Sequence, residues 1–348
     1  MAEVRWERYP EVAGNETTRA WLRIEGNLGL ALNTIEAYGR ALEDYLKFSA
    51  TANVDILAVR REHIAAYVHD LASRRNPQRP NVVIIDSGAG LANATLQQRL
   101  TAIRLFYDFL IEEGIRSTNP VGRGHYTPRK GFGNVRDRGL IPRFRKLPWI
   151  PNEEQWRAVI QVVRQEPVRN RAMLAFAYDA ALRREELCAL ETGDLNPAHR
   201  LLAVRAETTK GRRARVVPYS ESTAQLYAAY LGVRRAFSHR SGRLFLSESR
   251  RNCSQPVSLW TWSKVVRAIA HASGVERFTP HTLRHLRLTD LARAGWDIHE
   301  IAEFAGHRSL ETTMLYIHLS GRELAAKLES GMAQLHLWRV KQLADATT

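Results

Sequence analysis

The sequence predicts a mainly α-helical protein that carries a small antiparallel β-sheet in its C-terminal half. Apolar residues recur at three- and four-residue spacing in the N-terminal third and again in the second half. Two extended runs within residues 201–220, joined by a turn that contains Gly211, have the pattern of a β-hairpin. Residues 119–150 lose the periodicity and are rich in Pro, Gly and Arg, as inter-domain linkers are. We therefore expect a helical domain at residues 1–118, a linker, and a mixed α/β domain at residues 151–348.

Three helices are predicted in the first domain, at residues 33–48, 63–75 and 94–114. One face of the first and third helices is apolar, through Ile35, Tyr38, Leu42 and Tyr45 and through Leu96, Leu100, Ile103, Tyr107 and Leu110. Asn33 and Asn93 are candidate N-caps, and Gly114 marks a helix end. Residues 76–93 hold two prolines and two glycines, which predicts a loop, with a short strand at 82–85 as the alternative.

The second domain is predicted to begin with helices at residues 152–163, 169–182 and 184–191. The hairpin follows, and helices resume through to the C-terminus. The helix-prone segment after Gly321 is a candidate arm for docking onto a neighbouring protomer. The alternative is a helix that folds back on its own domain.

Charge and cysteine content narrow the classes of function. The 51 Lys and Arg exceed the 36 Asp and Glu, giving a net charge of +15, which favours a polyanionic partner such as nucleic acid. A cationic enzyme without a polymer partner is the alternative. Cys188 and Cys253 are too few for a disulfide framework or a zinc site. Neither a signal peptide nor a run of about 20 apolar residues is found, so we expect a cytoplasmic protein.

The linker concentrates positive charge. Its candidate DNA-binding residues, each expected to contact phosphates, are Arg123, Arg129, Lys130, Arg143, Arg145 and Lys146. The alternative is a solvated tether whose charge only maintains solubility.

Four separated motifs carry the residue types needed for chemistry on a phosphodiester. They are AALRREEL with Arg183, TTKGRRAR with Lys210, TPHTLRHL with His281 and Arg284, and AGHRSLETTMLYIH with His307 and Tyr316. Taken in this order, the motifs resemble the active-site signature of the tyrosine recombinase (phage integrase) family, and the resemblance covers nearly the whole chain. It implies a SAM-like core-binding domain, then a catalytic domain, and a homo-tetramer assembled on specific sites in double-stranded DNA without metal or cofactor.

The resemblance also implies catalytic roles. Tyr316 would attack phosphorus, because a strand exchange that keeps the phosphodiester energy needs a covalent intermediate on a side chain. The products are a 3′-phosphotyrosine and a free 5′-hydroxyl. Arg183 and Arg284 would stabilise the charge on the non-bridging oxygens, for which two guanidinium groups with paired donors are suited.

The resemblance also implies which residues transfer protons. Lys210 would protonate the leaving 5′-oxygen. His281 would be the base for the phenol, whose ordinary pKa of about 10 leaves it protonated at neutral pH. His307 would hydrogen-bond a non-bridging oxygen.

Several of these assignments have a competitor. Arg184 competes with Arg183, and two further arginines share the turn with Lys210. Tyr316 alone is more typical of packing, although Leu310, Met314 and Ile317 predict that the apolar face of its helix lies elsewhere. His281 and His285, four residues apart, suggest a zinc pair, but Thr282 stands where the metalloprotease motif has Glu.

Three alternative functions are compatible with the pattern. A type IB topoisomerase-like enzyme shares the tyrosine chemistry but relaxes one duplex. A DNA-binding protein on the same scaffold would not cut, and a metal-dependent nuclease would cut only with its metal.

Overall fold

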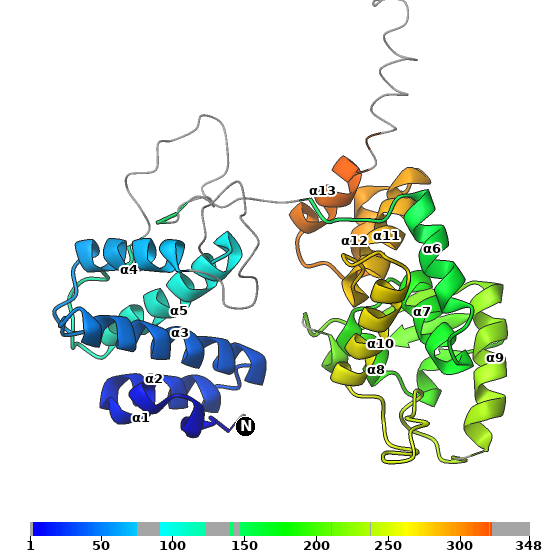
Figure 1. Cartoon of the computed structure of the whole chain (residues 1–348), viewed down its shortest axis with the longest axis horizontal. Coiled ribbons are helices and arrows are strands. Elements are labelled where there is room, and N and C mark those ends of the chain that lie inside the picture. The colour runs from blue at the N-terminus through cyan, green and yellow to red at the C-terminus, as the bar shows by residue number, and fades with distance from the viewer. Residues whose placement is uncertain are drawn as a thin grey trace, which may run out of the picture. The chain divides into compact units, whose positions relative to one another are not determined.

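Two helical units make up the chain, residues Met1–Lys146 and Leu147–Thr348 (Figure 1). The computed structural model describes residues 3–74, 91–122, 140–141, 147–209, 211–236, 238–319 and 321. No helix in these ranges is both long enough and apolar enough to cross a membrane. The predicted mainly helical fold with a small antiparallel sheet is confirmed.

The first unit consists of helices alone in its described part: η1 (Trp6–Arg8), α1 (Pro10–Gly14), α2 (Glu16–Asn27), α3 (Leu32–Thr51), α4 (Arg61–Ser73) and α5 (Asn93–Glu112). The three predicted helices correspond to α3, α4 and α5, and α3 packs against α5. The prediction omitted α1 and α2, although the fully buried Trp21 and Leu22 of α2 belong to the same core. Trp21 stacks on Tyr38 at 5.6 Å between ring centroids.

Two predicted helix starts are wrong by one or two residues. Asn33 lies inside α3, whose N-cap is Ala31, and Asn93 is the first residue of α5, whose N-cap is Ala92. The helices therefore begin before the first polar residue that could cap them. Gly114 follows the end of α5 as predicted, in the left-handed region at φ +70°. The predicted loop at residues 76–93 lies mostly outside the described residues.

Asp44 connects three helices of the first unit. Its carboxylate accepts hydrogen bonds from Tyr67 Oη on α4 at 2.7 Å, from Arg74 at the end of α4, and from Arg99 on α5. Nearby, the hydroxyls of Tyr45 and Tyr107 lie 2.7 Å apart. Because these buried and half-buried polar groups are paired, they help to fix the register of the helices at little desolvation cost.

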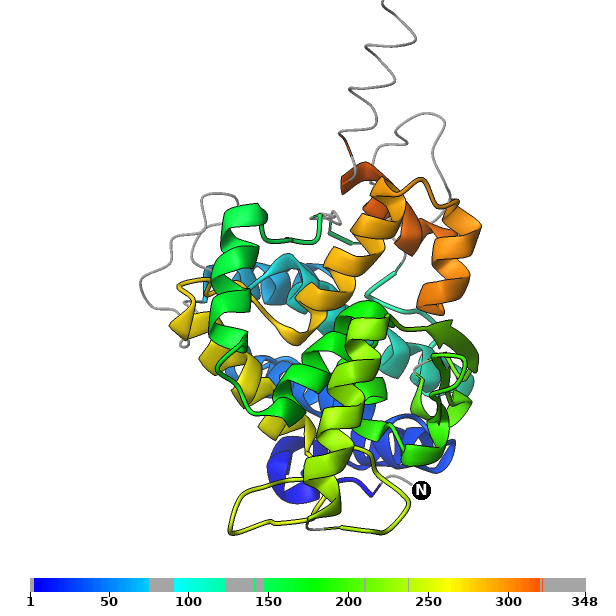
Figure 2. The same cartoon turned by 90° about the vertical axis from the view of Figure 1, so that its right-hand side faces the viewer.

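The second unit surrounds one core. Its elements are α6 (Glu153–Val163), α7 (Val168–Asp179), α8 (Arg184–Ala189), η2 (Thr192–Asp194), β1 (Leu195–Asn196), β2 (Leu201–Val204), η3 (Ala206–Thr208), β3 (Arg215–Pro218), α9 (Glu221–Arg235), α10 (Leu259–Ala272), α11 (Pro280–Arg293), α12 (Ile298–Ala305) and α13 (Leu310–Leu319). The helix α7 lies at the centre and packs against α9 and α11 (Figures 1 and 2).

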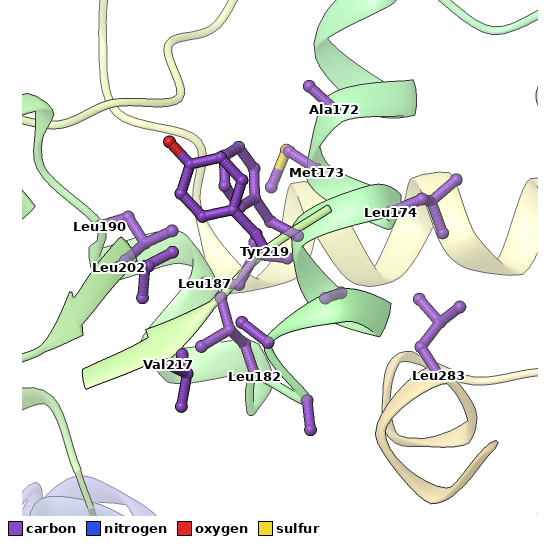
Figure 3. Packing of buried hydrophobic residues seen from close by; sticks show 14 of the residues in the cluster. Ala172, Met173, Leu174, Leu182, Leu187, Leu190, Leu202, Val217, Tyr219 and Leu283 are labelled. Atoms are coloured by element: carbon purple, nitrogen blue, oxygen red, sulfur yellow. The ribbon is translucent and has the colours of Figure 1, made fainter. Parts of the chain in front are cut away.

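The sheet closes one side of this core. Its order is β1-β2-β3 with both pairs antiparallel, and Leu202 pairs with Leu195 on one side and Val217 on the other. Leu202 and Val217 lie near Leu187 and Leu190 of the α8 region (Figure 3). The predicted hairpin is thus confirmed, while β1 was not predicted because two residues are too few to show a period.

Candidate active site

Three arginines from different elements converge on the last turn of α12. The carbonyl of Phe304 accepts a hydrogen bond from Arg215 Nε at 2.9 Å. The next carbonyl, of Ala305, accepts from Arg284 Nη2 at 2.6 Å, and that of Gly306 accepts from Arg183 Nη2 at 3.5 Å. The last carbonyls of a helix have no partner within it and carry partial negative charge, so they attract cations. The end of α12 therefore gathers positive charge from β3, α11 and the start of α8.

Gly306 makes this arrangement possible. It ends α12 in the left-handed conformation, with φ +63° and ψ +46°. A Cβ atom there would lie 3.1 Å from Arg215 Nη1. A glycine before His307 is therefore favoured both by its backbone conformation and by the close approach of Arg215.

We expect Gly306→Ala to destabilise the protein and lower its catalytic rate. The left-handed conformation alone costs a residue with a Cβ about 1–2 kcal/mol, and the contact with Arg215 adds to it. The matched control is Gly274→Ala, because Gly274 has φ +69° but no atom within 4 Å of the added Cβ. Urea unfolding should give a larger loss at Gly306 than at Gly274, and equal losses would show that the contact with Arg215 is immaterial.

Arg183 is held by the buried Glu186. Arg183 precedes α8 and donates from Nη1 to Glu186 Oε1 at 2.7 Å and from its backbone nitrogen to Oε2 at 3.0 Å. Arg215 Nη2 donates to the same Oε2 at 2.7 Å. Burial alone raises the pKa of Glu186, but the hydrogen bonds and charge of Arg215, with those of Arg183, outweigh it and lower the pKa to about 2.

This pKa shift makes the free energy of unfolding depend on pH in the acid range. The pKa of Glu186 falls from 4.5 to about 2 on folding, so its contribution is complete above pH 4.5 and is lost as the pH falls toward 2. The contribution is roughly 3 kcal/mol. Urea unfolding of wild type and Glu186→Gln should therefore differ strongly at pH 6 and much less at pH 2.5. If wild type and Glu186→Gln differed by the same free energy of unfolding at both pH values, the buried ion pair would be contradicted. The control is Glu154→Gln, because Glu154 is exposed.

Arg284 is almost fully buried, with 3% exposure. It donates from Nη1 to the carbonyl of Ala181 at 2.5 Å in addition to its bond to Ala305. Ala181 has φ +46°, a left-handed conformation that is unfavourable for a residue with a Cβ, and it turns the chain from α7 into α8. Burial, and then the charge of Arg183, lower the pKa of Arg284 to about 9. The guanidinium thus remains charged at neutral pH.

Tyr316 on α13 lies in the core of the unit, with 3% exposure. The prediction that the apolar face of this helix lies elsewhere is wrong, because Leu310 and Met314 are each 40% exposed. Helix α13 packs on α11 and α12, and its Tyr316 contacts His285 of α11. Burial raises the pKa of the Tyr316 hydroxyl, and the charges of Arg284 and Arg183 oppose that shift.

Two histidines contact Tyr316. The ring of His307 stacks on the tyrosine ring at 6.0 Å and an interplanar angle of 8°, and its Nδ1 lies 2.9 Å from Thr313 Oγ1. His285 Nδ1 lies 2.9 Å from Tyr316 Oη. Burial, and then the charge of Arg284, lower the pKa of His307 to about 3. His307 is therefore neutral at neutral pH.

Of the predicted catalytic residues, four lie together: Arg183, Arg284, His307 and Tyr316. His281 lies at the edge of the group, exposed in the first turn of α11, with its ring 6.2 Å from that of His285. Lys210 lies outside the described residues. The next residue, Gly211, is described, and a Cβ atom on it would lie 3.4 Å from the side chain of Arg308.

The six predicted linker contacts, Arg123, Arg129, Lys130, Arg143, Arg145 and Lys146, also lie outside the described residues. Arg184, the competitor of Arg183, bonds to Glu185 and to Ser263 of α10 instead of the end of α12. Within the described ranges, no three His, Cys, Asp or Glu side chains come together as a metal site would require.

Three residues of the site were not predicted: Glu186, Arg215 and His285. Glu186 had a signal in the sequence, because a Glu three residues after Arg183 places its carboxylate over the start of the same helix. Arg215 is the first residue of β3 and has no local signal. His285 was considered only as half of a zinc pair.

This fold and this site define an enzyme class. A helical unit is followed by a unit in which arginines and histidines surround a buried tyrosine, as in tyrosine recombinases, which cut and rejoin DNA strands. Residues 151–323 match the phage integrase family and residues 21–114 match the phage integrase N-terminal SAM-like domain. The chain belongs to this family.

Comparison with individual proteins gives the same family. The chain is 28% identical over 317 residues to tyrosine recombinase XerD of Oceanobacillus iheyensis, covering 89% of this chain and 95% of the relative. It is 32% identical over 251 residues to tyrosine recombinase XerC of Chlorobaculum parvum, covering 66% and 70%. The fold resembles XerH site-specific recombinase bound to palindromic difH substrate in a post-cleavage complex, with a TM-score of 0.64, 19% identity and coverage of 85% and 80%.

Proposed function

We propose that this tyrosine recombinase recombines specific DNA sites with Tyr316 as its nucleophile. The observation that carries the assignment is the position of the Tyr316 hydroxyl, which lies 2.9 Å from a histidine nitrogen and within the electrostatic reach of Arg183 and Arg284. A buried tyrosine in a structural role does not require two buried or half-buried guanidinium groups beside it. A phosphodiester drawn in by these cations would meet the phenol oxygen.

The chemical step follows from the charges. Tyr316 Oη attacks phosphorus, the bond from phosphorus to the 5′-oxygen breaks, and a 3′-phosphotyrosine forms. Negative charge on the non-bridging oxygens rises in the transition state. Arg183 and Arg284 stabilise it most effectively because they are already fixed, by Glu186 and by the carbonyls of Ala181 and Ala305.

The neutral His307 acts as a hydrogen-bond donor to the phosphate and positions the ring of Tyr316 by stacking. Lys210 protonates the leaving 5′-oxygen, a role that rests on its place in the sequence motif. His281, which the sequence predicts as the base, is exposed at the start of α11. The rejoining step is the same reaction reversed, with a 5′-hydroxyl of another strand as attacking group.

Partner binding is proposed from charge and from the relatives. The net charge of +15 supports duplex DNA as the partner, and the XerH structure holds its difH substrate. We assign the phosphate contacts of the linker to Arg123, Arg129, Lys130, Arg143, Arg145 and Lys146. Exchange between two duplexes needs four strand cuts, so the active assembly is a homo-tetramer on DNA. The alternative of a type IB topoisomerase-like enzyme is not favoured, because the relatives described above are recombinases.

The experiment that tests the proposal traps the covalent intermediate. A cognate site is selected from random duplexes by binding, and a nick is placed beside the cut position so that the released fragment diffuses away. Wild type is incubated with this DNA in EDTA. We expect an adduct on a denaturing gel, joined to the 3′ end, with the modified peptide containing Tyr316. Tight binding without any cleavage or adduct would support the non-catalytic scaffold. Cleavage that occurs only when metal is added, and that leaves no protein joined to the DNA, would support the nuclease.

A further inference from the structure

His285 is the ring in direct contact with the reacting atom. Its Nδ1 lies 2.9 Å from Tyr316 Oη, and the two ring centroids are 5.8 Å apart. The two other histidines of the site are placed differently. His307 uses its Nδ1 for Thr313, and His281 is exposed one turn nearer the start of α11. The position expected of a base for the phenol is therefore occupied by His285.

We propose that His285 is a catalytic residue, the group that accepts the phenolic proton when Tyr316 attacks DNA and returns it when the strands are rejoined. This proposal rests on the proposed role of Tyr316 as nucleophile. As the bond from Oη to phosphorus forms and the bond from phosphorus to the 5′-oxygen breaks, the hydrogen on Oη passes to Nδ1. His285 becomes an imidazolium, and the leaving 5′-oxygen takes its proton from a different group, for which Lys210 is assigned.

The surroundings of His285 keep it ready for this role. Burial, followed by His281 and Arg284, lowers the pKa of His285 to about 4. The ring is thus neutral at neutral pH, and with its hydrogen on Nε2 the lone pair of Nδ1 accepts the hydroxyl of Tyr316. The groups that face it are His281 and Arg284 on its own helix, His307 before α13, and Tyr316 itself. A bound phosphodiester adds negative charge that favours the imidazolium.

Backbone geometry keeps the contact in place. His285 lies in the second turn of α11, immediately after the buried Arg284, which is anchored on the carbonyls of Ala181 and Ala305. Its own carbonyl accepts from Thr289 Oγ1, a fully buried hydroxyl. Helix α13, which carries Tyr316, packs directly on α11. The histidine and the tyrosine are therefore held by two helices that share a core.

The test compares His285→Asn with His281→Asn in single-turnover cleavage of the nicked site at saturating DNA. Asparagine can accept a hydrogen bond near the position of Nδ1 but cannot take up a proton. We expect His285→Asn to slow cleavage by about 10²–10⁴-fold at neutral pH with unchanged DNA affinity. The defect should shrink as the pH rises, because the phenol then ionises without a base. His281→Asn should lose much less.

A second substrate separates the base from the acid. When the 5′-bridging oxygen is replaced by sulfur, the leaving group needs no proton, so a variant that lacks the acid recovers its rate and one that lacks the base does not. We expect no recovery for His285→Asn. Recovery, or a wild-type rate and pH profile, would overturn the proposal. A large loss for His281→Asn with a normal His285→Asn would assign the base to His281.

Two control measurements separate a folding defect from the loss of a base. Circular dichroism and urea unfolding show whether His285→Asn is folded, and His285→Ala supplied with imidazole gives a second measurement, because added imidazole should restore part of the rate if the missing group is a base. Failure of imidazole to restore any rate in a folded variant counts against the proposal. If wild type itself forms no adduct, the nucleophile assignment fails; if wild type reacts and His285 variants do also, only the present inference fails.

Discussion

Tyr316→Phe should abolish the covalent protein–DNA adduct while leaving the fold and DNA binding intact. Phenylalanine keeps the ring that stacks on His307 and fills the same buried space, but it has no attacking oxygen. Removal of a nucleophile from an enzyme that forms a covalent intermediate costs roughly 10⁴-fold or more in rate. Cleavage of the nicked site should therefore fall below detection, as measured by denaturing gel.

The chain offers a matched control for this substitution. Tyr219 is also buried in the second unit, at 4% exposure, and within the described residues its hydroxyl has no hydrogen-bond partner. Tyr219→Phe should cleave at the wild-type rate and unfold at an equal or higher urea concentration, because it removes an unpaired buried oxygen. Persistent adduct formation by Tyr316→Phe would require another nucleophile.

Arg284→Ala should lose both catalysis and stability. Removal of one preorganised donor from a site that stabilises developing negative charge typically slows the reaction about 10²–10³-fold. The same substitution leaves the carbonyls of Ala181 and Ala305 without the donor they have now, which costs about 1–3 kcal/mol for each unpaired group. Arg284→Lys should restore part of the stability but little activity, since one ammonium cannot reach two carbonyls and a phosphate together.

Two measurements separate these effects. Urea unfolding reports the loss of stability, and single-turnover cleavage at a temperature where the variant is fully folded reports the loss of catalysis. Arg293→Ala, at the exposed end of the same helix, should change neither by more than a small amount. A variant that is as stable as wild type would contradict the structural role of Arg284.

Much of the fold was predictable because it depends on local periodicity. The spacing of Ile35, Leu42 and Tyr45 is a property of one helix, and all three are buried in α3. The starts of helices were predicted less well. Asn33 and Asn93 are residue types that favour the N-cap, but both lie within their helices, because the backbone enters the helix earlier than the residue types indicate. The short strand β1 exists only because β2 pairs with it.

The features of the site also fall into those that local sequence predicts and those that it does not. Arg183 and Tyr316 were predictable from spaced motifs, but the burial of Tyr316 was not, because it depends on which side of α13 meets α11 and α12. The contact of His285 with Tyr316 joins residues 31 positions apart. The pairing of Arg215 with Glu186 joins strand and helix across 29 positions, and no local rule selects it.

The three successive carbonyls of Phe304, Ala305 and Gly306 couple the positions of three arginines to the end of α12. Each holds an arginine from a different element, so one short stretch of backbone is a common point of attachment. A displacement of this stretch would break one hydrogen bond of each arginine at once, while Glu186 would still hold Arg183 and Arg215 and the carbonyl of Ala181 would still hold Arg284. The end of α12 is therefore one short element whose position sets the geometry of all three guanidinium groups relative to Tyr316.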